Sequence, residues 1–410
     1  MTMKMKFFLM LLLAACSLSG AFAQNYEELL RPLEELDART QRAREAGRYG
    51  ETVRCCKEQI RFYEELPDSV RRDLDSWNGG DWQAGTYYNL ACYQSLAGHS
   101  RAAVAALEEA YGRGYFEQDF SAYDWMLRDS DLDPIRNTKG YEEVRLKAAE
   151  QGDFIGMLRA SRPYDPEAAV DSLPPFRYAN PDDRDLVRLR QRFNLDSIAG
   201  AGDELSKIRN LCHWVHNAVR HDGSSYNPTE RNAIAMIELC RREGRGVNCR
   251  MLAQILNECY LAMGFKSRFV TCMPRKMVND CHVINAVYSN TLGKWLWMDP
   301  SFEAWVTDPE GTMLSIAEVR DCLRDGKPCR LNPEANWNNE QPQTQEDYLE
   351  VYMAKNLYYV VCSDRSEFDT ETLREGKRPL HYVALVPPGY ETDMLSTSND
   401  RWFWASPYGD

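Results

Sequence analysis

The stretch that most constrains this chain is Gly246-Val-Asn-Cys249-Arg-Met-Leu-Ala253, which has the pattern of a helix start with a thiol in its first turn. Asn248 is a favoured N-cap residue, so Cys249 is expected at the first helical position. Unsatisfied backbone N–H groups and the positive end of the helix dipole favour a thiolate there. Apolar residues continue at helical spacing until Gly264, a natural stop. The alternative is that Cys249 is only the first buried residue of an apolar helix face.

A hairpin downstream supplies two further polar groups. Residues 281–288 and 294–298 have the pattern of strands, and residues 289–293 form the expected turn between them. The midpoint of His282 and Asp299 lies inside that turn, so antiparallel pairing places the two residues opposite or nearly opposite each other. A thiol at a helix N-terminus, a histidine on a strand and an aspartate beside it are the components of a nucleophile, a general base and an orienting group.

Together these pieces resemble the transglutaminase-like superfamily over roughly residues 200–320. The resemblance rests on Gly-Val-Asn-Cys249-Arg, the helix to Met-Gly264-Phe, the Ser267-Arg268-Phe-Val strand, His282 at a strand start and Trp297-Met-Asp299-Pro300. It implies a papain-like fold, in which a helix carrying the cysteine packs on an antiparallel sheet carrying the histidine and the aspartate. It also implies that Cys249 is the nucleophile, His282 the base and Asp299 the orienting group.

One departure from the family pattern concerns the loop before the cysteine. Many members have Gly-x-Cys, whereas two residues separate Gly246 from Cys249 here, which leaves the loop geometry and its oxyanion contacts open. Members often take a second oxyanion donor from an aromatic or amide side chain upstream of the cysteine. By that resemblance the candidates are Trp214 and Asn217, on an amphipathic helix expected over residues 203–220.

Other charged and titratable residues near this helix have less specific interpretations. Four arginines either lower the pKa of the nucleophile through their field or form a solvated face paired with acidic residues. These are Arg241, Arg242, Arg245 and Arg250. Three histidines are interpreted as solvated or structural, because none has the spacing of metal ligands. These are His213, His216 and His221. We expect no metal and no cofactor.

Composition limits the remaining function classes. The 410 residues suffice for two or three domains with substantial cores. With 44% hydrophobic and 27% charged residues, the chain is globular rather than disordered. A formal net charge of −13 without an offsetting basic stripe argues against nucleic acid as a partner, because phosphate binding needs clustered Lys and Arg.

Residues 1–23 have the pattern of a signal peptide. Lys4 and Lys6 form a positive n-region, an apolar core follows, and Ala21-Phe-Ala23 is a small-residue cleavage site. We therefore expect an extracytoplasmic protein, either periplasmic or secreted. Leu13-Ala-Ala-Cys16 also resembles a lipobox, and in that alternative a lipidated cysteine tethers the protein to a membrane. No other run is long enough to span a bilayer.

Residues 24–160 are predicted to form a helical domain. Tyr87-x-x-Leu90-Ala91, followed by Ala103-x-x-x-Leu107-x-x-Ala110, resembles a tetratricopeptide repeat. Only this repeat is convincing, so one or two degenerate repeats are expected. The helical domain is interpreted either as a surface for a protein partner or as a brace for the catalytic domain.

The predicted fold class is α+β: this helical region is followed by a transglutaminase-like, papain-like domain with an antiparallel sheet. Prolines between 161 and 199 indicate a linker, and the catalytic domain is placed at 200–330. Residues 331–346 are rich in Asn, Gln and Pro and are predicted to be a linker loop. Residues 347–410 are predicted to be a C-terminal β extension.

The leading functional hypothesis is an exported enzyme for acyl transfer at amide bonds, with a peptide or protein amide as substrate and Cys249, His282 and Asp299 as its triad. Hydrolysis by a peptidase or amidase is favoured over transamidation, because nothing in the sequence indicates a site that holds a second amine and excludes water. The alternative is a catalytically silent binding protein, which uses its helical repeat to capture a partner and its transglutaminase-like fold as a scaffold.

Overall fold

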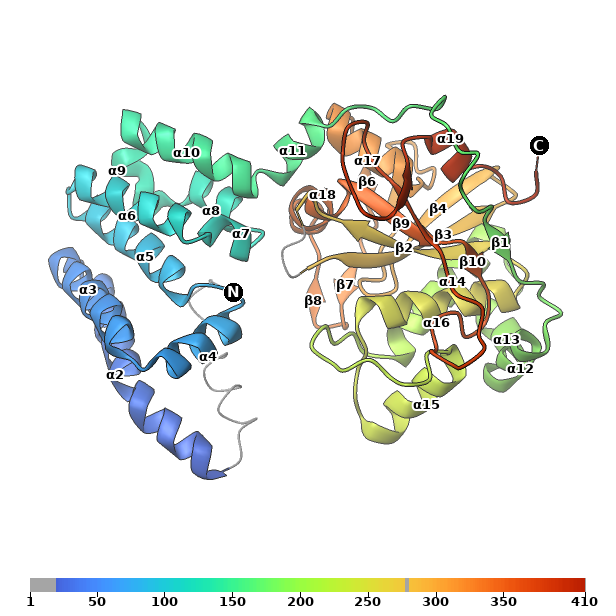
Figure 1. Ribbon diagram of the computed structural model, residues 1–410, viewed down its shortest axis with the longest axis horizontal. Coiled ribbons are helices and arrows are strands. Elements are labelled where there is room, and N and C mark those ends of the chain that lie inside the picture. The colour runs from blue at the N-terminus through green and yellow to red at the C-terminus, as the bar shows by residue number, and fades with distance from the viewer. Residues whose placement is uncertain (1–19, 277–279, 410) are drawn as a thin grey trace. The chain divides into compact units, whose positions relative to one another are not determined.

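The computed structural model describes residues 20–276 and 280–409 and divides into two compact units (Figure 1). One unit runs up to Phe154 and the other begins at Ile155, so the boundary falls shortly before the end predicted for the helical domain. The signal-peptide and lipobox predictions concern residues almost wholly outside the described ones. Within the described residues, no helix combines the length and the apolar character needed to cross a bilayer.

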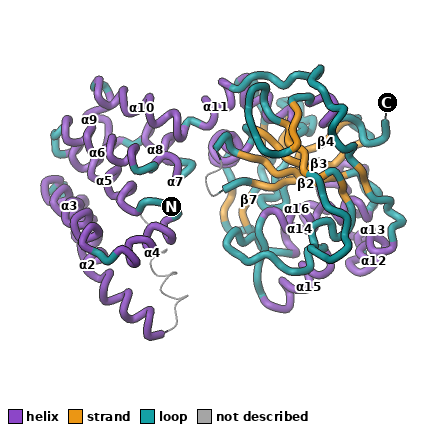
Figure 2. Tube along the Cα trace, in the orientation of Figure 1, coloured by secondary structure: helices purple, strands orange, loops and turns teal. Residues whose placement is uncertain are grey.

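The first unit is helical throughout its described part, as predicted (Figure 2). Its helices are α2 (Gly20–Glu45), α3 (Tyr49–Glu65), α4 (Asp68–Asn78), α5 (Trp82–Leu96), α6 (Ser100–Gly112), α7 (Tyr115–Gln118), α8 (Ala122–Arg128), η1 (Ser130–Leu132), α9 (Asp133–Arg136) and α10 (Lys139–Gly152), with α11 (Phe154–Ala160) spanning the boundary. Small side chains let the central pair α5 and α6 pack closely: Ala84, Ala91, Ala103 and Ala110 are fully buried there.

The second unit is built on one six-stranded sheet. Its strands are β2 (Ser267–Met273), β3 (His282–Ser289), β4 (Lys294–Met298), β9 (Tyr359–Ser363), β11 (Tyr382–Leu385) and β12 (Leu395–Thr397). They lie in the order β12-β11-β9-β2-β3-β4, and all neighbours are antiparallel except β11 and β12. The predicted α+β class and its mainly antiparallel sheet are therefore confirmed.

Three two-stranded pairings complete the strands of this unit. They are β1 (Arg177–Tyr178) with β10 (Arg365–Ser366), β5 (Val306–Thr307) with β6 (Arg330–Leu331), and β7 (Asn336–Trp337) with β8 (Gln341–Pro342). The helices are α12 (Arg184–Phe193), α13 (Leu195–Ala199), α14 (Glu204–Ala218), α15 (Ala233–Glu243), α16 (Cys249–Ala262), α17 (Ile316–Asp325), α18 (Ala354–Asn356), α19 (Asp400–Phe403) and the π-helical segment η2 (Glu346–Met353).

Two hydrophobic cores cover the sheet. Helices α12 to α16 form one core with it, in which Leu256 of α16 meets Val287 of β3. The other core joins Ile284 of β3 to Leu349 of η2 and to Phe403 of α19. Because side chains alternate along a strand, β3 contributes to both cores and is buried along its whole length. This double burial fixes the strand that begins with His282.

Two segments differ from what their composition predicted. Residues 161–199 contain α12 and α13, which contribute to the core under α16. Residues 331–346 contain the β7–β8 hairpin rather than a plain linker loop. Residues 347–410 supply η2 and three strands of the main sheet, and they lie in the same unit as residues 200–330.

Candidate active site

Cys249 begins α16, as the sequence predicts. The Asn248 side chain accepts a hydrogen bond from the Met251 N–H (3.1 Å) and caps the helix. The helix ends at Ala262, and Gly264 follows in the left-handed conformation with φ of +87°. Every residue from Met251 to Ala262 is buried, whereas Cys249 is partly exposed. The rigid buried helix therefore holds the thiol at its accessible end.

The loop before the cysteine runs alongside residues 220–222. The Val247 N–H donates to the Arg220 carbonyl (3.0 Å), and the Asp222 N–H donates to the Val247 carbonyl (2.8 Å). A Cβ on Gly246 would lie only 2.5 Å from the Arg220 carbonyl oxygen. Glycine is needed at this position because the two paired backbone segments approach closely there. The Gly-x-x-Cys spacing thus places the glycine at the close approach and leaves the capping residue next to the thiol.

Gly246→Ala is expected to lower the free energy of unfolding by about 1–3 kcal/mol, because a carbonyl fixed in a backbone pairing cannot move aside as a side chain can. Urea unfolding measures the loss. The control is Gly223→Ala in the same loop, whose added Cβ would meet its nearest neighbour, a His221 ring carbon, at an ordinary 3.8 Å. Equal stability of the two variants would contradict the close approach.

His282 begins β3, and Asp299 follows the end of β4. The register pairs Asn285 with Met298, so Asp299 extends towards the position opposite Ile284. That position lies two residues beyond His282 and on the same face of the strand. The predicted pairing is therefore shifted by two residues, yet His282 Nε2 lies 2.7 Å from Asp299 Oδ2. The structure brings the predicted histidine and aspartate together.

The Asp299 carboxylate is fully buried, and both of its oxygens accept hydrogen bonds. Oδ2 accepts from the Tyr348 hydroxyl (2.7 Å) as well as from His282, and Oδ1 accepts from the Ser301 N–H (2.8 Å). Burial disfavours ionisation, but the charge of His282 and these hydrogen bonds outweigh it and keep the pKa of Asp299 below its usual value. A charged carboxylate thus holds His282 Nε2 and leaves Nδ1 for the sulfur.

Tyr348→Phe is expected to lower the free energy of unfolding by about 1.5–3 kcal/mol, because a buried carboxylate loses a hydrogen bond that a phenyl ring cannot replace. Urea unfolding measures this loss. Tyr226→Phe is the matched control, since its hydroxyl donates to Glu243 (3.2 Å) at the surface, and its loss should be much smaller. Equal losses in the two variants would show that Asp299 does not depend on Tyr348.

Aromatic rings fix the orientation of the His282 imidazole. The rings of Phe302 and Tyr352 lie edge-on to it, with centroids 5.6 Å and 5.2 Å away. Tyr352 and Tyr348 are four residues apart on η2, so one short segment supports both the histidine and its carboxylate. Segments of π-helix often occur at functional sites.

Cys249 and His282 form the charged pair of the site. Burial raises the pKa of the thiol, but hydrogen bonds from His221 and His282 outweigh it and lower that pKa to about 6. Burial likewise disfavours the imidazolium, but Asp299 and Cys249 raise the pKa of His282 to about 10. Between these values the two shifts favour a thiolate beside an imidazolium. The pairing with His282 thus favours the deprotonated form of the Cys249 sulfur near neutral pH.

The upstream side chain that contacts the sulfur is His221 rather than Trp214 or Asn217. The Trp214 ring packs on Phe193, with centroids 5.5 Å apart. The Asn217 amide donates to a backbone carbonyl (2.8 Å) and accepts from Asn339 (3.0 Å). The two residues predicted as oxyanion donors therefore have other partners, and His221, interpreted from the sequence as solvated or structural, is the upstream histidine beside the sulfur.

The four arginines near α16 interact with partners other than the thiol. Each has an acidic or aromatic partner, in the pairs Arg250–Glu371, Arg242–Glu243, Arg241–Phe193 and Arg245–Tyr226. The hypothesis that their field activates the nucleophile is not needed, because the two histidines account for the lowered pKa of Cys249.

The described residues contain one cluster of side chains of the types that bind metal ions, and it lies in the helical unit. It consists of Cys92, Asp129 and Asp131. Asp129 already accepts hydrogen bonds from the Tyr88 hydroxyl (3.0 Å) and the Trp125 indole N–H (3.1 Å). Burial raises the pKa of the Cys92 thiol well above its usual value. A protonated thiol beside a carboxylate that already accepts two hydrogen bonds is a poor ligand set, because metals bind the thiolate.

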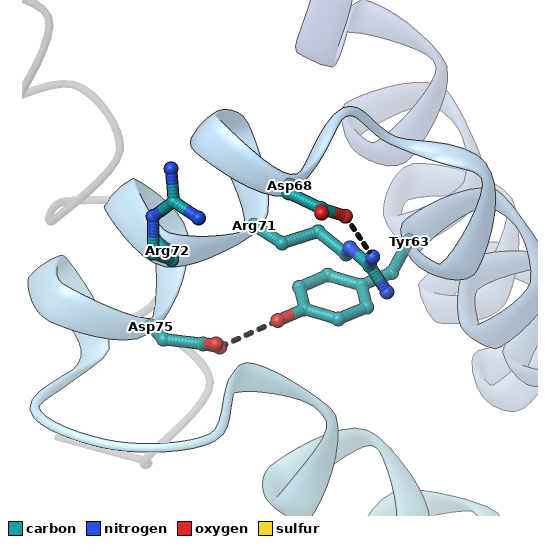
Figure 3. Close-up of a pocket in the computed structure, with 5 residues that line it drawn as sticks. All are labelled: Tyr63, Asp68, Arg71, Arg72 and Asp75. Carbon is teal, nitrogen blue, oxygen red and sulfur yellow. Dashed lines mark hydrogen bonds and ion pairs between the residues drawn. The ribbon is translucent and has the colours of Figure 1, made fainter.

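A shallow pocket also lies in the helical unit, between α3 and α4 (Figure 3). It is lined by Tyr63, Asp68, Arg71, Arg72 and Asp75. Its carboxylates already have partners, since Asp68 pairs with Arg71 and the Tyr63 hydroxyl donates to Asp75 (2.6 Å). The pocket shares no residue with the Cys249 site and offers no group for acyl chemistry.

The fold and the site define a class of protein in which a helix-borne cysteine meets a histidine and an aspartate carried by an antiparallel sheet. Residues 191–300 match the sequence profile of the transglutaminase-like superfamily, so this chain carries a transglutaminase-like domain and the predicted resemblance is confirmed.

Matches to individual proteins add little. No curated protein matches the chain significantly. A solved structure of a candidate cysteine protease from Cytophaga hutchinsonii matches at 18% identity with a TM-score of 0.24, over 36% of this chain and 46% of that one. The chain thus spans less than half of that protein, and we infer nothing from the similarity.

Proposed function

We propose that this protein is an exported, cysteine-dependent enzyme for acyl transfer at amide bonds, acting on a peptide or protein substrate. The observation that carries the proposal is the buried His282 imidazole, whose Nε2 lies 2.7 Å from the carboxylate of Asp299 and which hydrogen-bonds to the Cys249 sulfur and lowers its pKa. These are the groups that amide acyl transfer needs: a nucleophile, a proton donor for the leaving amine and a carboxylate that orients the imidazole.

In the first half-reaction, the thiolate attacks the amide carbonyl carbon and a C–S bond forms, while the π electrons of the carbonyl move onto oxygen. When those electrons return, the C–N bond breaks and the His282 imidazolium gives its Nδ1 proton to the departing amine. The Asp299 carboxylate holds the opposite nitrogen throughout. This step yields a free amine, a thioester on Cys249 and a neutral His282.

In the second half-reaction, neutral His282 takes a proton from water or from an amine. The oxygen or nitrogen of that nucleophile bonds to the acyl carbon while the C–S bond breaks, which regenerates the thiolate and the imidazolium. We favour hydrolysis over transamidation, because no described feature indicates a site that holds a second amine and excludes water.

A peptide-amide library, incubated with and without the primary amine cadaverine, tests this proposal. Mass spectrometry is expected to find hydrolysed products with wild type and none with Cys249→Ala, and quenched samples should show an acyl adduct on Cys249. Cys322→Ala, which removes another partly exposed thiol outside the site, should retain turnover. Incorporation of cadaverine in excess of hydrolysis would instead assign transamidation.

The absence of any product or adduct that depends on Cys249 would overturn the proposal. It would favour the silent scaffold, in which the helical unit binds a partner. Export is tested separately, by determining the N-terminal residue of the mature protein and the effect of Cys16→Ser on membrane association. An unprocessed N-terminus beginning at Met1 would contradict export through a cleaved signal.

A further inference from the structure

His221 is held beside the nucleophile by its backbone. It lies in the turn after α14 and forms a parallel bridge with Val247, two residues before Cys249. The turn of the β7–β8 hairpin also holds the His221 backbone. The Asn338 side chain accepts from the His221 N–H (2.8 Å) and donates to the His221 carbonyl (3.0 Å). The position of this imidazole is therefore set by two separate segments of the unit.

A tryptophan of the same hairpin fixes the tautomer of His221. The Trp337 indole N–H lies 2.9 Å from His221 Nδ1. An indole nitrogen can only donate, so Nδ1 must carry a lone pair and the proton of the neutral ring must sit on Nε2. Because Nδ1 is taken, Nε2–H is the group left to hydrogen-bond the Cys249 sulfur. A proton on Nδ1 would face the Trp337 N–H, and two donors cannot hydrogen-bond to each other.

The two imidazoles at the sulfur therefore have different partners and different chemistry. His282 is backed by the Asp299 carboxylate, which favours its cationic form. His221 is backed by the Trp337 N–H, which occupies Nδ1 and leaves Nε2 as the donor. One ring is thus suited to exchange protons, and the other to donate a hydrogen bond without losing its proton.

We propose that His221 is a catalytic residue that donates from Nε2–H to the oxyanion formed during acyl transfer, and that Trp337 is its positioning residue. The inference rests on the proposed function. Attack moves negative charge from the sulfur to the carbonyl oxygen. The His221 N–H that hydrogen-bonds the resting sulfur lies close enough to the reacting carbon to hydrogen-bond this oxygen instead. The Cys249 backbone N–H, in the first turn of α16, is the second donor.

Burst kinetics with p-nitrophenyl acetate test this assignment, because ester acylation forms the same oxyanion but needs no proton on the leaving group. Because His221 also lowers the pKa of the thiol, each variant is compared on its own alkaline plateau, where the thiol is fully ionised. There His221→Phe is expected to lower the acylation rate constant at saturation by a factor on the order of 10² to 10³. The half-saturating concentration should change little, because the oxyanion exists only in the transition state. His221→Gln keeps an N–H donor, so its acylation rate constant should be about tenfold higher than that of His221→Phe.

Trp337→Phe tests the positioning role. It should lower the same rate constant less than His221→Phe does, and the double variant should be no slower than His221→Phe alone, because Trp337 acts only through His221. His99→Phe in the helical unit, where the ring contacts Gln94 (2.8 Å), is the matched control and should leave the burst unchanged.

The outcomes separate this inference from the proposal on which it rests. If Cys249→Ala gives the same burst as wild type, the proposed function fails and the role of His221 fails with it. If the burst depends on Cys249 but His221→Phe leaves the rate constant unchanged, or changes only the half-saturating concentration, the oxyanion role alone is overturned. Additive effects of His221→Phe and Trp337→Phe would overturn the positioning role.

Discussion

His282→Ala is expected to lower kcat/KM for a peptide amide by a factor on the order of 10⁴. Two losses combine in this variant. The thiol loses the imidazolium that helps to lower its pKa to about 6, so less thiolate is present at neutral pH. The leaving amine also loses its proton donor, and an amide cannot expel an unprotonated amine readily. Initial rates on a peptide amide selected from the library measure the change.

His381→Ala is the control for this substitution. His381 also pairs with an aspartate, Asp364 (3.1 Å), but it is half-exposed and lies outside the site, so kcat/KM should stay near that of wild type. For p-nitrophenyl acetate the effect of His282→Ala should be smaller than for the amide, because nitrophenolate leaves without a proton. Equal losses on ester and amide would argue against His282 as the proton donor.

Asp299→Ala is expected to lower the free energy of unfolding by about 3–5 kcal/mol, because it leaves a buried histidine without its counter-charge. It also removes the acceptor for the Tyr348 hydroxyl and the Ser301 N–H. Urea unfolding measures the loss. Asp308→Ala is the control, since its carboxylate accepts a backbone hydrogen bond from Thr312 (2.8 Å) in a partly exposed turn, and its loss should be far smaller.

The pH dependence of this destabilisation has a definite sign. The folded pKa of His282 is raised to about 10, so its contribution is complete below the unfolded histidine value of about 6.5 and is lost as pH rises through about 10. The folded pKa of Asp299 is lowered, so its contribution is present above about 3.9 and is lost on acidification. The difference between wild type and Asp299→Ala should therefore be largest between about pH 4 and 6.5. A difference that grows with alkalinity would contradict the ion pair.

The positions of Cys249, His282 and Asp299 could be predicted from the sequence because each follows from a local signal. Asn248 marks the start of a helix whose apolar residues repeat up to Gly264, and the hairpin between β3 and β4 is short enough to count across. The remaining uncertainty was a shift of two residues in register. That shift keeps both side chains on one face, so the geometry is preserved.

The groups around the triad could not be predicted, because their roles depend on contacts between distant segments. The Trp337 indole meets His221 across 116 residues, and the Tyr348 hydroxyl meets Asp299 across 49. No periodicity or motif links such positions. The asparagines of residues 336–339 have the composition of a surface loop, yet in the structure the Asn338 amide holds the backbone of His221.

The rate of iodoacetamide alkylation of Cys249 against pH tests most directly whether the imidazolium of His282 holds this sulfur as a thiolate. Peptide mass spectrometry follows this thiol separately from the other cysteines. We expect a midpoint near pH 6 in wild type, shifted upward towards the value of a free thiol, about 8.5, in His282→Ala. A single midpoint near that of a free cysteine, unchanged by the substitution, would contradict the account.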